Sequence, residues 1–540
     1  MRLSVFTAFA AAASLAAPAV AQPKAAPPRL IIAISVDQLS ADLFDTYRPH
    51  FTGGFKRLVD QGVTFVNGYQ SHAETETCPG HSTLLTGHHP GVTGVIANNW
   101  INQGAPRADK KVYCAEDEAA PGSTFQNYQV SPVHLKVPTL GELLKARDPR
   151  SRNVAVAGKD RTAVMMSGAR VDQRWYWNGK DWVSDLKDAP VPATLPRFRA
   201  AFAAQFAQAR PPLVPPPLCQ ARATPYQLTP TLTVGNGTLG RAAGDEEGMR
   251  TSPEHDGAVL ALAAGLASEL NLGRGPAPDV LAVGLSATDR VGHSYGWGGQ
   301  EMCLHLLALD RELGDFLSVM DRRGVPYAVV LSADHGAADL PERLRAQGDT
   351  RAQRADPALG ADAMGKVIAA DLGLSRPALL GDGIGGAVWL DREIEPSRRP
   401  AVLAAALARY RAHPQVETVI TAEESARLPM PTGDSSRWTL AQRVRAGFDP
   451  QRSGDFYLVL KAGVATKTRP TKGGVASHGL PWDYDRRVPI LFVAPGHKPA
   501  SPTAAADTVD ILPTVASWIG LKLAPGSVDG VCRSEAATCR

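Results

Sequence analysis

Three apolar segments constrain the fold of this chain more than any other feature of its sequence. They run from residue 30 to 36, from 279 to 285 and from 327 to 331, and they consist mostly of Val, Ile, Leu and Ala. A strand is apolar along its whole length when both of its faces are buried, which is typical of a parallel sheet covered by helices. We therefore predict an α/β fold built on a mostly parallel sheet.

Acidic residues and histidines accompany these segments. The carboxyl ends of the strands in an open α/β sheet converge on one crevice, so side chains at these positions would meet in space. A further histidine stands before a fourth apolar run, from residue 488 to 493. The candidate residues are Asp37 after the first segment, Asp289 and His293 after the second, Asp334 and His335 after the third, and His478 before the fourth.

The hydroxyl of Thr77 is the candidate nucleophile. Thr77 stands directly before the run Cys-Pro-Gly-His-Ser-Thr-Leu-Leu, and Pro79 suits the first turn of a helix, so Thr77 falls at or next to an N-cap. Free backbone N–H groups and the helix dipole favour an anion there, either a bound phosphate or the alkoxide of the hydroxyl itself. Taken alone, such a threonine is more often an ordinary helix cap. The Asp and His residues elsewhere in the chain favour the catalytic interpretation.

Carboxylate and imidazole groups together suit Zn²⁺ with one position left open for a substrate. With the Thr77 hydroxyl, the three aspartates and three histidines make seven candidate ligands, too many for one tetrahedral ion and about right for two. Taken alone, Asp289 and His293 fit a surface pair on a helix, because they are four residues apart. One pair of ions would satisfy every group at once, so we predict two Zn²⁺ per chain.

Several more titratable residues crowd the segment around Thr77. We interpret Glu74 and Glu76 as solvated loop charges or as acceptors for a ligand imidazole. We interpret the histidines as structural or as partners of ligand residues, with His81 the most relevant to the site. The histidines of this segment are His72, His81, His88 and His89.

These motifs together resemble the alkaline phosphatase superfamily of two-zinc phosphoryl-transfer enzymes. Asn98 and the segment Gly-Lys-Asp-Arg at residues 158–161 narrow the resemblance to PafA-type, phosphate-irrepressible alkaline phosphatases with a threonine nucleophile, such as the enzyme of Sphingomonas. The motifs occur in the order of the family between about Leu30 and Leu521. The resemblance implies a three-layer sandwich, with helices on both faces of the sheet and inserted cap segments.

The resemblance also implies roles for single residues. Lys159 and Arg161 would clamp the phosphate, and they would point to one side if their segment were extended. Asn98 would donate a hydrogen bond to a nonbridging oxygen. One zinc ion would be held by Asp289, His293 and His478, and the other by Asp37, Thr77, Asp334 and His335.

The function implied is zinc-dependent hydrolysis of phosphate monoesters through a phosphothreonine intermediate, with broad substrates at alkaline pH. The nearest alternative is a nucleotide pyrophosphatase or phosphodiesterase, which shares the zinc ligands but would not need Lys-x-Arg. A sulfatase fits less well, because its Cys-x-Pro-x-Arg motif is absent: Pro79 follows Cys78 directly. A secreted zinc- or phosphate-binding protein is the non-enzymatic alternative, and Thr77 beside a full ligand set argues against it.

Composition and the N-terminus indicate where such a protein works. A net charge of +4 over 540 residues, without a dense Lys/Arg stripe, gives no reason to expect nucleic acid or an anionic membrane surface as a partner. Residues 1–21 have the charged start, apolar stretch and Ala-Val-Ala end of a signal peptide. No later run is long enough to span a bilayer. We expect a periplasmic or secreted monomer that acts on small phosphate monoesters.

Six cysteines suit a compartment in which disulfides persist. We predict a bond between Cys532 and Cys539, which would close a short C-terminal loop. A bond between Cys78 and Cys114 is attractive because it would fix the segment beside Thr77, and it would leave Cys219 and Cys303 as a third pair. Fifteen pairings are possible in total, and the sequence does not decide among them.

The spacing of the candidate ligands suggests how the chain is divided. They are absent from residues 337–471, which we interpret as an insertion or cap with helices at 361–372 and 399–412. Residues 22–336 would form the first part of the core, with an irregular excursion at about 208–252, and residues 472–540 the final part. Within the core we predict a strand at 153–157, an Asn-Gly hairpin at 175–182 and a last helix at 508–521.

Overall fold

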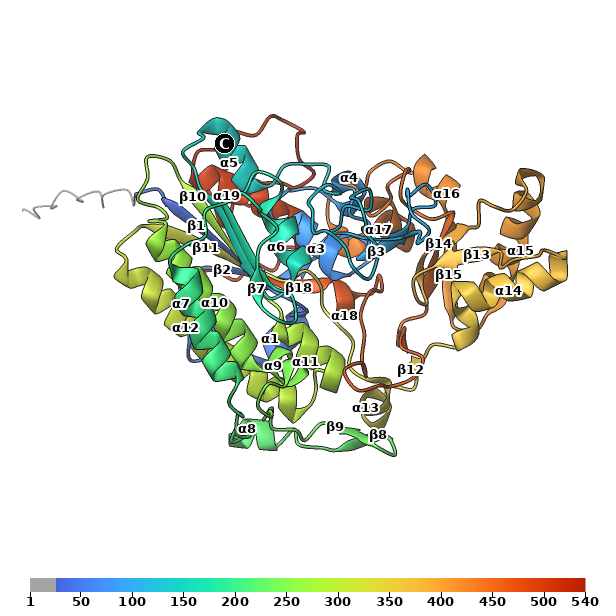
Figure 1. Ribbon diagram of the computed structural model, residues 1–540, viewed down its shortest axis with the longest axis horizontal. Helices are drawn as coiled ribbons and strands as arrows, with labels where there is room; N and C mark the ends of the chain where they lie inside the picture. Colours follow the sequence, from blue (N-terminus) through green and yellow to red (C-terminus); the bar gives the residue numbers. More distant parts are fainter. Residues whose placement is uncertain (1–25, 540) are drawn as a thin grey trace, which may run out of the picture.

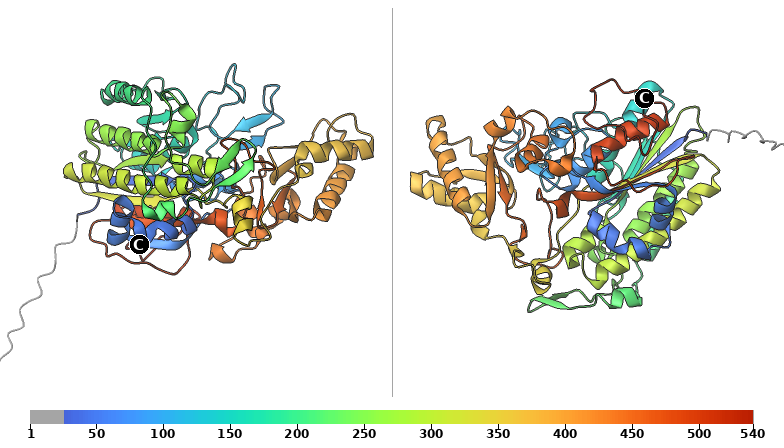
Figure 2. Two further views of the ribbon diagram at one scale, coloured as in Figure 1. Left: turned by 90° about the horizontal axis from the view of Figure 1, so that it is seen from below. Right: turned by 180° about the vertical axis from the view of Figure 1, so that it is seen from behind.

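The computed structural model describes residues 26–539 and is organised around a nine-stranded sheet (Figures 1 and 2). At its centre, β1 (Leu30–Val36) lies parallel to both β10 (Asp279–Leu285) and β11 (Tyr327–Ser332). The strand order is β19-β2-β18-β11-β1-β10-β5-β6-β7. Five of the pairings are parallel and three are antiparallel, so the predicted mostly parallel sheet is confirmed. The other strands are β2 (Val63–Tyr69), β5 (Asn153–Ala157), β6 (Gln173–Trp177), β7 (Trp182–Val183), β18 (Arg487–Val493) and β19 (Ala506–Asp507).

Both faces of this sheet are covered, which explains why its central strands are mostly apolar. In β1, Ile32 and Ile34 pack into one hydrophobic core while Ile31 and Ala33 pack into the other. Helices α7, α10 and α12 lie on the first face, and α5, α6 and α19 lie on the second (Figure 1). The three-layer architecture is therefore confirmed. These helices are α5 (Leu140–Arg147), α6 (Asp160–Ser167), α7 (Thr194–Phe206), α10 (Pro253–Glu269), α12 (Gln300–Arg322) and α19 (Ile511–Trp518), and the first face also carries α1 (Ala41–Tyr47) and α2 (Gly54–Gln61).

The antiparallel direction of β18 places the loop before it at the functional edge of the sheet. Residue 491 of β18 pairs with residue 331 near the end of β11, so the start of β18 lies beyond the carboxyl end of its neighbour. The loop that contains His478 therefore faces the same edge as the ends of β1, β10 and β11. His478 reaches this edge from a loop and not from the end of a strand.

A second sheet, with the order β13-β14-β16-β15, forms a separate lobe with its own hydrophobic core (Figure 1). All its strands fall between residues 337 and 471, and the two helices predicted there are present as α14 (Ala361–Leu372) and α15 (Arg399–Ala412). The division of the chain into core and insertion stays a prediction. The strands are β13 (Leu379–Gly381), β14 (Gly386–Leu390), β15 (Val416–Thr421) and β16 (Phe456–Leu460), and α16 (Ala422–Arg427) and α17 (Leu440–Ala446) lie between β15 and β16 along the chain.

Short elements complete the fold. The predicted Asn-Gly hairpin is the antiparallel pair β6–β7. The final helix, predicted at 508–521, spans Ile511–Trp518, because its first turn is a 3₁₀ helix and it ends three residues earlier than predicted. The excursion before α10 contains short helices and a hairpin. The short pieces are β3 (Asn99–Ile101), β4 (Lys111–Tyr113), β8 (Tyr226–Thr229), β9 (Leu232–Val234), β12 (Gln353–Arg354), β17 (Val464–Ala465), α3 (Thr77–Leu84), α4 (Pro90–Thr93), α8 (Pro217–Gln220), α9 (Glu246–Arg250), α11 (Ala287–Tyr295), α13 (Pro341–Ala346) and α18 (Asp483–Arg486).

Three disulfides join the six cysteines as Cys78–Cys114, Cys219–Cys303 and Cys532–Cys539. Each of the pairings considered from the sequence is present. Within residues 26–539, no helix combines the length and the apolar composition needed to cross a bilayer. The predicted signal peptide at 1–21 lies outside the described residues.

Candidate active site

The structure brings the predicted Asp and His residues together at one edge of the central sheet. Asp37 directly follows β1, and Asp289 and His293 lie one turn apart on α11. The Nε2 atom of His293 is 3.1 Å from Oδ1 of Asp289, and Nε2 of His478 is 3.6 Å from the same oxygen. Nε2 of His335 is 3.5 Å from Oδ1 of Asp37 and 3.4 Å from Oδ2 of Asp334.

All three imidazoles of this cluster present the same ring nitrogen to it. In each ring Nδ1 faces a backbone carbonyl oxygen, which fixes the proton on that nitrogen and leaves the Nε2 lone pair free. Metal-binding histidines commonly have this arrangement, because the carbonyl orients the ring. The contacts are His293 Nδ1 to Ala476 O at 2.9 Å, His335 Nδ1 to Gly336 O at 2.9 Å, and His478 Nδ1 to Thr75 O at 2.8 Å.

The ligand atoms form two overlapping sets, each with atoms within 4.8 Å of one another. One set is Asp289, His293 and His478, the same trio that the resemblance implies. The other is Asp37, Asp289 and His335, so Asp289 belongs to both sets, whereas the resemblance implied Asp334 in the second. Asp334 adjoins this set through His335 and His81.

The donor set fits divalent metal ions on chemical grounds. Oδ1 of Asp37, Oδ2 of Asp334 and Nε2 of His335 are buried and have no hydrogen-bond partner among residues 26–539. Buried polar atoms are rarely left without a partner, and a cation would supply one for all three. Two carboxylates and an imidazole with free lone pairs are ligands that Zn²⁺ accepts.

Lys159 lies within this cluster. Its Nζ atom donates to Oδ2 of Asp37 at 2.5 Å and to Oδ2 of Asp289 at 2.6 Å, so it bridges two of the predicted metal ligands. Burial raises the pKa of Asp37 to about 7, although Lys159 opposes the shift. Burial also acts to raise the pKa of Asp289, but Lys159 and His293 overcome it and hold that pKa well below its usual range. The positive charge of Lys159 therefore stabilises two buried carboxylates.

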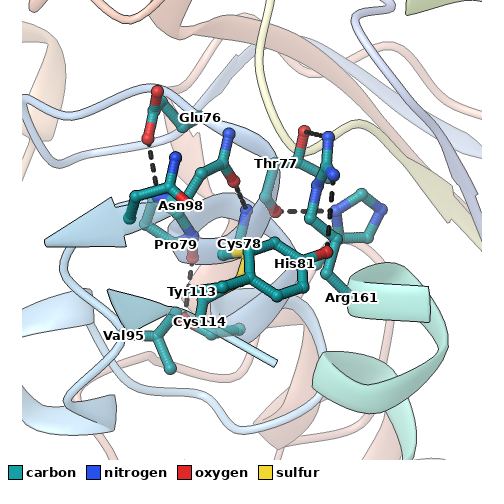
Figure 3. The surroundings of a disulfide bond; sticks show 12 residues. Glu76, Thr77, Cys78, Pro79, His81, Val95, Asn98, Tyr113, Cys114 and Arg161 are labelled. Atoms are coloured by element: carbon teal, nitrogen blue, oxygen red, sulfur yellow. Dashed lines mark hydrogen bonds between the residues drawn. A yellow bond between two sulfur atoms is a disulfide. The ribbon is translucent and has the colours of Figure 1, made fainter. Parts of the chain in front are cut away.

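Thr77 and Arg161 face each other across the site (Figure 3). Thr77 is the first residue of α3, one position after the N-cap residue Glu76, which agrees with the predicted placement. Nη2 of Arg161 donates to Oγ1 of Thr77 at 3.3 Å. The predicted extended segment at 159–161 is wrong, because α6 begins at Asp160 and Lys159 is its N-cap residue. The two basic side chains reach the site from the start of a helix.

Asn98 is held beside the nucleophile by two hydrogen bonds (Figure 3). Its main-chain N–H donates to Oε2 of Glu76 at 2.6 Å, and its side-chain Oδ1 accepts from the N–H of Cys78 at 2.8 Å. The amide NH₂ of Asn98 is thereby left as a donor. The interpretation of Glu76 as a solvated charge or an imidazole acceptor is wrong, because its carboxylate caps the N–H of Asn98.

Two further residues support the cluster. His81 Nδ1 is hydrogen-bonded to the carbonyl oxygen of Thr77 at 2.8 Å and lies 3.1 Å from Oδ2 of Asp334 without forming a second hydrogen bond, so it places the nucleophile helix next to a predicted ligand. Gln38 was not predicted: its Nε2 donates to Oδ1 of Asp289 at 3.0 Å, and its N–H donates to Oδ1 of Asp334 at 3.1 Å. Its φ of 69° is unusual for a residue other than glycine and is typical of strained functional sites. Its position directly after Asp37 was the only sequence signal.

Comparison with known proteins gives a consistent assignment. The family described as type I phosphodiesterase / nucleotide pyrophosphatase matches residues 31–481. Alkaline phosphatase PhoK of Sphingomonas sp. is 48% identical over 94% of this chain and 91% of its own length, and alkaline phosphatase PhoD of Zymomonas mobilis is 43% identical over 95% and 89%. The crystal structure of wild-type alkaline phosphatase PafA shares the fold, with a TM-score of 0.82 and 24% identity over 96% of this chain and 100% of that one. The chain therefore belongs to the type I phosphodiesterase / nucleotide pyrophosphatase family and, within it, to the alkaline phosphatases.

Proposed function

We propose that this enzyme hydrolyses phosphate monoesters through a phosphothreonine intermediate on Thr77, with zinc as cofactor and with broad substrates at alkaline pH. The single observation that carries the proposal is the contact between Arg161 and the Thr77 hydroxyl, beside a cluster of Asp and His side chains. A nucleophile, a fixed cation and a metal-type donor set are the parts that phosphoryl transfer requires.

The proposed metal ligands are those of the sequence prediction. Asp289, His293 and His478 would hold one zinc ion, and Asp37, Asp334, His335 and Thr77 the other. The proximity of Asp289 to both sets supports it as a residue that could serve either ion. When bound, zinc would neutralise charge on phosphoryl oxygens and lower the pKa of adjacent hydroxyl groups and water.

The protein residues then account for the bond changes. Oγ1 of Thr77 gives up its proton and forms a bond to phosphorus as the bond to the leaving oxygen breaks, and the leaving oxygen takes up one proton, so that the group departs as an alcohol or phenol. Water next bonds to phosphorus as the bond to Oγ1 breaks, which restores the threonine hydroxyl and releases inorganic phosphate. Arg161 would bind phosphoryl oxygens with its planar fork, and Lys159 and Asn98 would each donate to one of them.

The family name also covers phosphodiesterases, which makes diester hydrolysis the competing activity. A monoester dianion presents more negative charge than a diester, and Lys159 and Arg161 supply two positive charges to meet it. The pair therefore supports monoester hydrolysis. We also propose a periplasmic or secreted monomer, in line with the three disulfides.

Turnover of p-nitrophenyl phosphate and bis(p-nitrophenyl) phosphate by the purified enzyme tests this proposal. We expect preference for the monoester, loss of activity with a chelator and recovery with zinc. Thr77→Ala should lose most turnover but retain zinc, whereas Thr77→Ser should keep much of it because the hydroxyl survives. Near-normal activity of Thr77→Ala would refute the role of Thr77, and preference for the diester would favour the competing activity.

A further inference from the structure

Covalent bonds and hydrogen bonds together form a closed ring that contains Thr77, the Cys78–Cys114 disulfide and Arg161 (Figure 3). Cys78 directly follows Thr77 in the sequence, and Cys114 directly follows Tyr113. The Cys78–Cys114 disulfide joins these two pairs covalently. Arg161 completes the ring, because its Nη1 donates to the hydroxyl of Tyr113 at 3.5 Å and its Nη2 donates to Oγ1 of Thr77 at 3.3 Å.

The phenol of Tyr113 is itself oriented by a carboxylate. Its hydroxyl donates to Oδ1 of Asp160 at 2.7 Å, so its oxygen lone pairs remain available to Arg161. Tyr128 donates to the other oxygen, Oδ2 of Asp160, also at 2.7 Å, but no hydrogen bond joins Tyr128 to Arg161. Burial, and next the charge of Asp160, raise the pKa of Tyr113 well above its usual range, so the phenol keeps its proton in alkaline solution.

Arg161 depends on Tyr113 for its orientation. Within residues 26–539, Tyr113 and Thr77 are the two acceptors of its guanidinium, and its Nε is buried without a partner. A guanidinium binds a planar anion through two parallel hydrogen bonds, so its usefulness depends on the direction in which the fork points. An acceptor on one terminal nitrogen limits rotation about the side-chain bonds and holds the other nitrogen toward the nucleophile.

The disulfide fixes the distance between this acceptor and the nucleophile. It attaches the β3–β4 hairpin, which ends at Tyr113, to the start of α3. Asn98 reinforces the attachment, because it accepts from the N–H of Cys78 through its side chain and from the N–H of Cys114 through its carbonyl oxygen at 2.9 Å. Tyr113 and Thr77 thus lie on elements that are joined covalently and by hydrogen bonds.

We propose that Tyr113 is a positioning residue that holds the guanidinium of Arg161 toward Thr77, and that the Cys78–Cys114 disulfide keeps Tyr113 in place. The inference rests on the proposed function, because it assigns Tyr113 a role in the orientation of a phosphate-binding arginine. Tyr113 acts through Arg161 and takes no part in bond making or breaking.

The experiment compares Tyr113→Phe with the matched control Tyr128→Phe, since each removes one hydrogen bond to Asp160 but only the first removes the acceptor for Arg161. With p-nitrophenyl phosphate and zinc-saturated protein, we expect kcat/KM to fall about 10-fold for Tyr113→Phe, the scale of one hydrogen bond to a charged group. Tyr128→Phe should lose about 2-fold or less, the effect of a substitution away from the reacting groups.

A double-mutant cycle separates positioning from a general structural effect. In an Arg161→Ala background, Tyr113→Phe should have almost no further effect on kcat/KM, because the residue that it orients is gone. A purely structural role would predict the same loss in both backgrounds. Equal losses for the two tyrosine variants, or a loss that persists without Arg161, would overturn the inference.

The role of the disulfide is tested by removing it as a pair, Cys78→Ala with Cys114→Ala, against the control pair Cys532→Ala with Cys539→Ala. The first pair should lower kcat/KM and also reduce the effect of Tyr113→Phe, whereas the control pair should leave that effect unchanged. An unchanged effect in both pairs would refute the part assigned to the disulfide, while the tyrosine comparison would still decide the role of Tyr113. Absence of monoester turnover in the wild-type enzyme would overturn the proposed function instead.

Discussion

Replacement of Lys159 by methionine tests how much its positive charge stabilises the buried carboxylates of Asp37 and Asp289. In the structure, Lys159 Nζ bonds to Asp37 and Asp289 at 2.5 and 2.6 Å, and all three side chains are 5% exposed or less. Lys159→Met keeps the apolar stem and removes the charge, which leaves two buried carboxylates without their cation. Removal of one partner from a buried ion pair destabilises a protein by about 3–5 kcal/mol. We therefore expect the free energy of unfolding of chelator-treated Lys159→Met to be lower than that of the chelator-treated wild type by about this amount.

The expected loss in the free energy of unfolding is smaller when zinc is bound, because metal ions would neutralise the same two carboxylates. By linkage, the difference between the two losses equals the gain in zinc-binding free energy. If zinc recovers about 1.4–2.8 kcal/mol of the loss, zinc should bind on the order of 10- to 100-fold more tightly to Lys159→Met than to the wild type.

Two measurements check this prediction: urea unfolding with and without zinc, and competition for zinc with a chromophoric chelator. Lys145→Met is the matched control, because Lys145 Nζ also contacts two carboxylate oxygens, both on Asp172, at 2.7 and 2.9 Å and away from the cluster. The control should lose the same stability with and without zinc. Equal losses for Lys159→Met in both conditions, with unchanged zinc affinity, would refute the reasoning.

Three further predictions follow from the site and from a second pair of buried acids. Elemental analysis should find about two zinc ions per chain, given seven ligands at roughly four per ion; a single ion, or activation by magnesium alone, would contradict the ligand assignment. Arg161→Ala should lower kcat/KM for a monoester more than for a diester with the same leaving group, by about 1.5–3 kcal/mol, and equal losses would mean that Arg161 only maintains the shape of the site. Burial and the neighbouring Asp510 raise the pKa of Asp507 from 3.8 to about 7. A pKa that is higher in the folded state contributes stability below the unfolded value and loses it as the pH rises through the folded value, so the free energy of unfolding should fall between about pH 4 and 7. Asp507→Asn should flatten this dependence in urea unfolding at pH 5 and pH 8, and an unchanged slope would refute the assignment to Asp507.

The central strands were predictable because their environment leaves a clear pattern in the sequence. β1 alternates between two hydrophobic cores, so every position except Ser35 is apolar, and its bounds could be predicted from composition alone. The direction of β18 could not be predicted in the same way. A buried strand has the same pattern whether it runs parallel or antiparallel, and the loop before it decides its direction. His478 could be identified as a candidate ligand from the sequence. Only the fold shows why it reaches the site: the antiparallel direction of β18 places the preceding loop at the carboxyl ends of β1, β10 and β11.

The candidate site likewise contains residues that the sequence predicted and contacts that it did not. Asp37, Asp289 and Asp334 could be proposed because they follow buried strands, where a polar residue needs a partner. The contact between Lys159 and two of these carboxylates could not be predicted, because it depends on side chains from three different elements. The start of α6 at Asp160 was also missed, and with it the correct geometry of Lys159 and Arg161. Tyr113 lies at the end of a three-residue strand and has no sequence signal of its own.

Acid quenching during turnover tests the central claim most directly, because it traps a covalent phosphoryl-enzyme if one forms. The enzyme is mixed with a large excess of p-nitrophenyl phosphate, quenched in acid within the first turnovers and digested for peptide mass spectrometry. The account predicts phosphate on the peptide that begins the α3 helix, assigned by fragmentation to Thr77, and its absence from Thr77→Ala. Phosphate on another residue, or full turnover of the wild type without any phosphorylated peptide, would contradict the account.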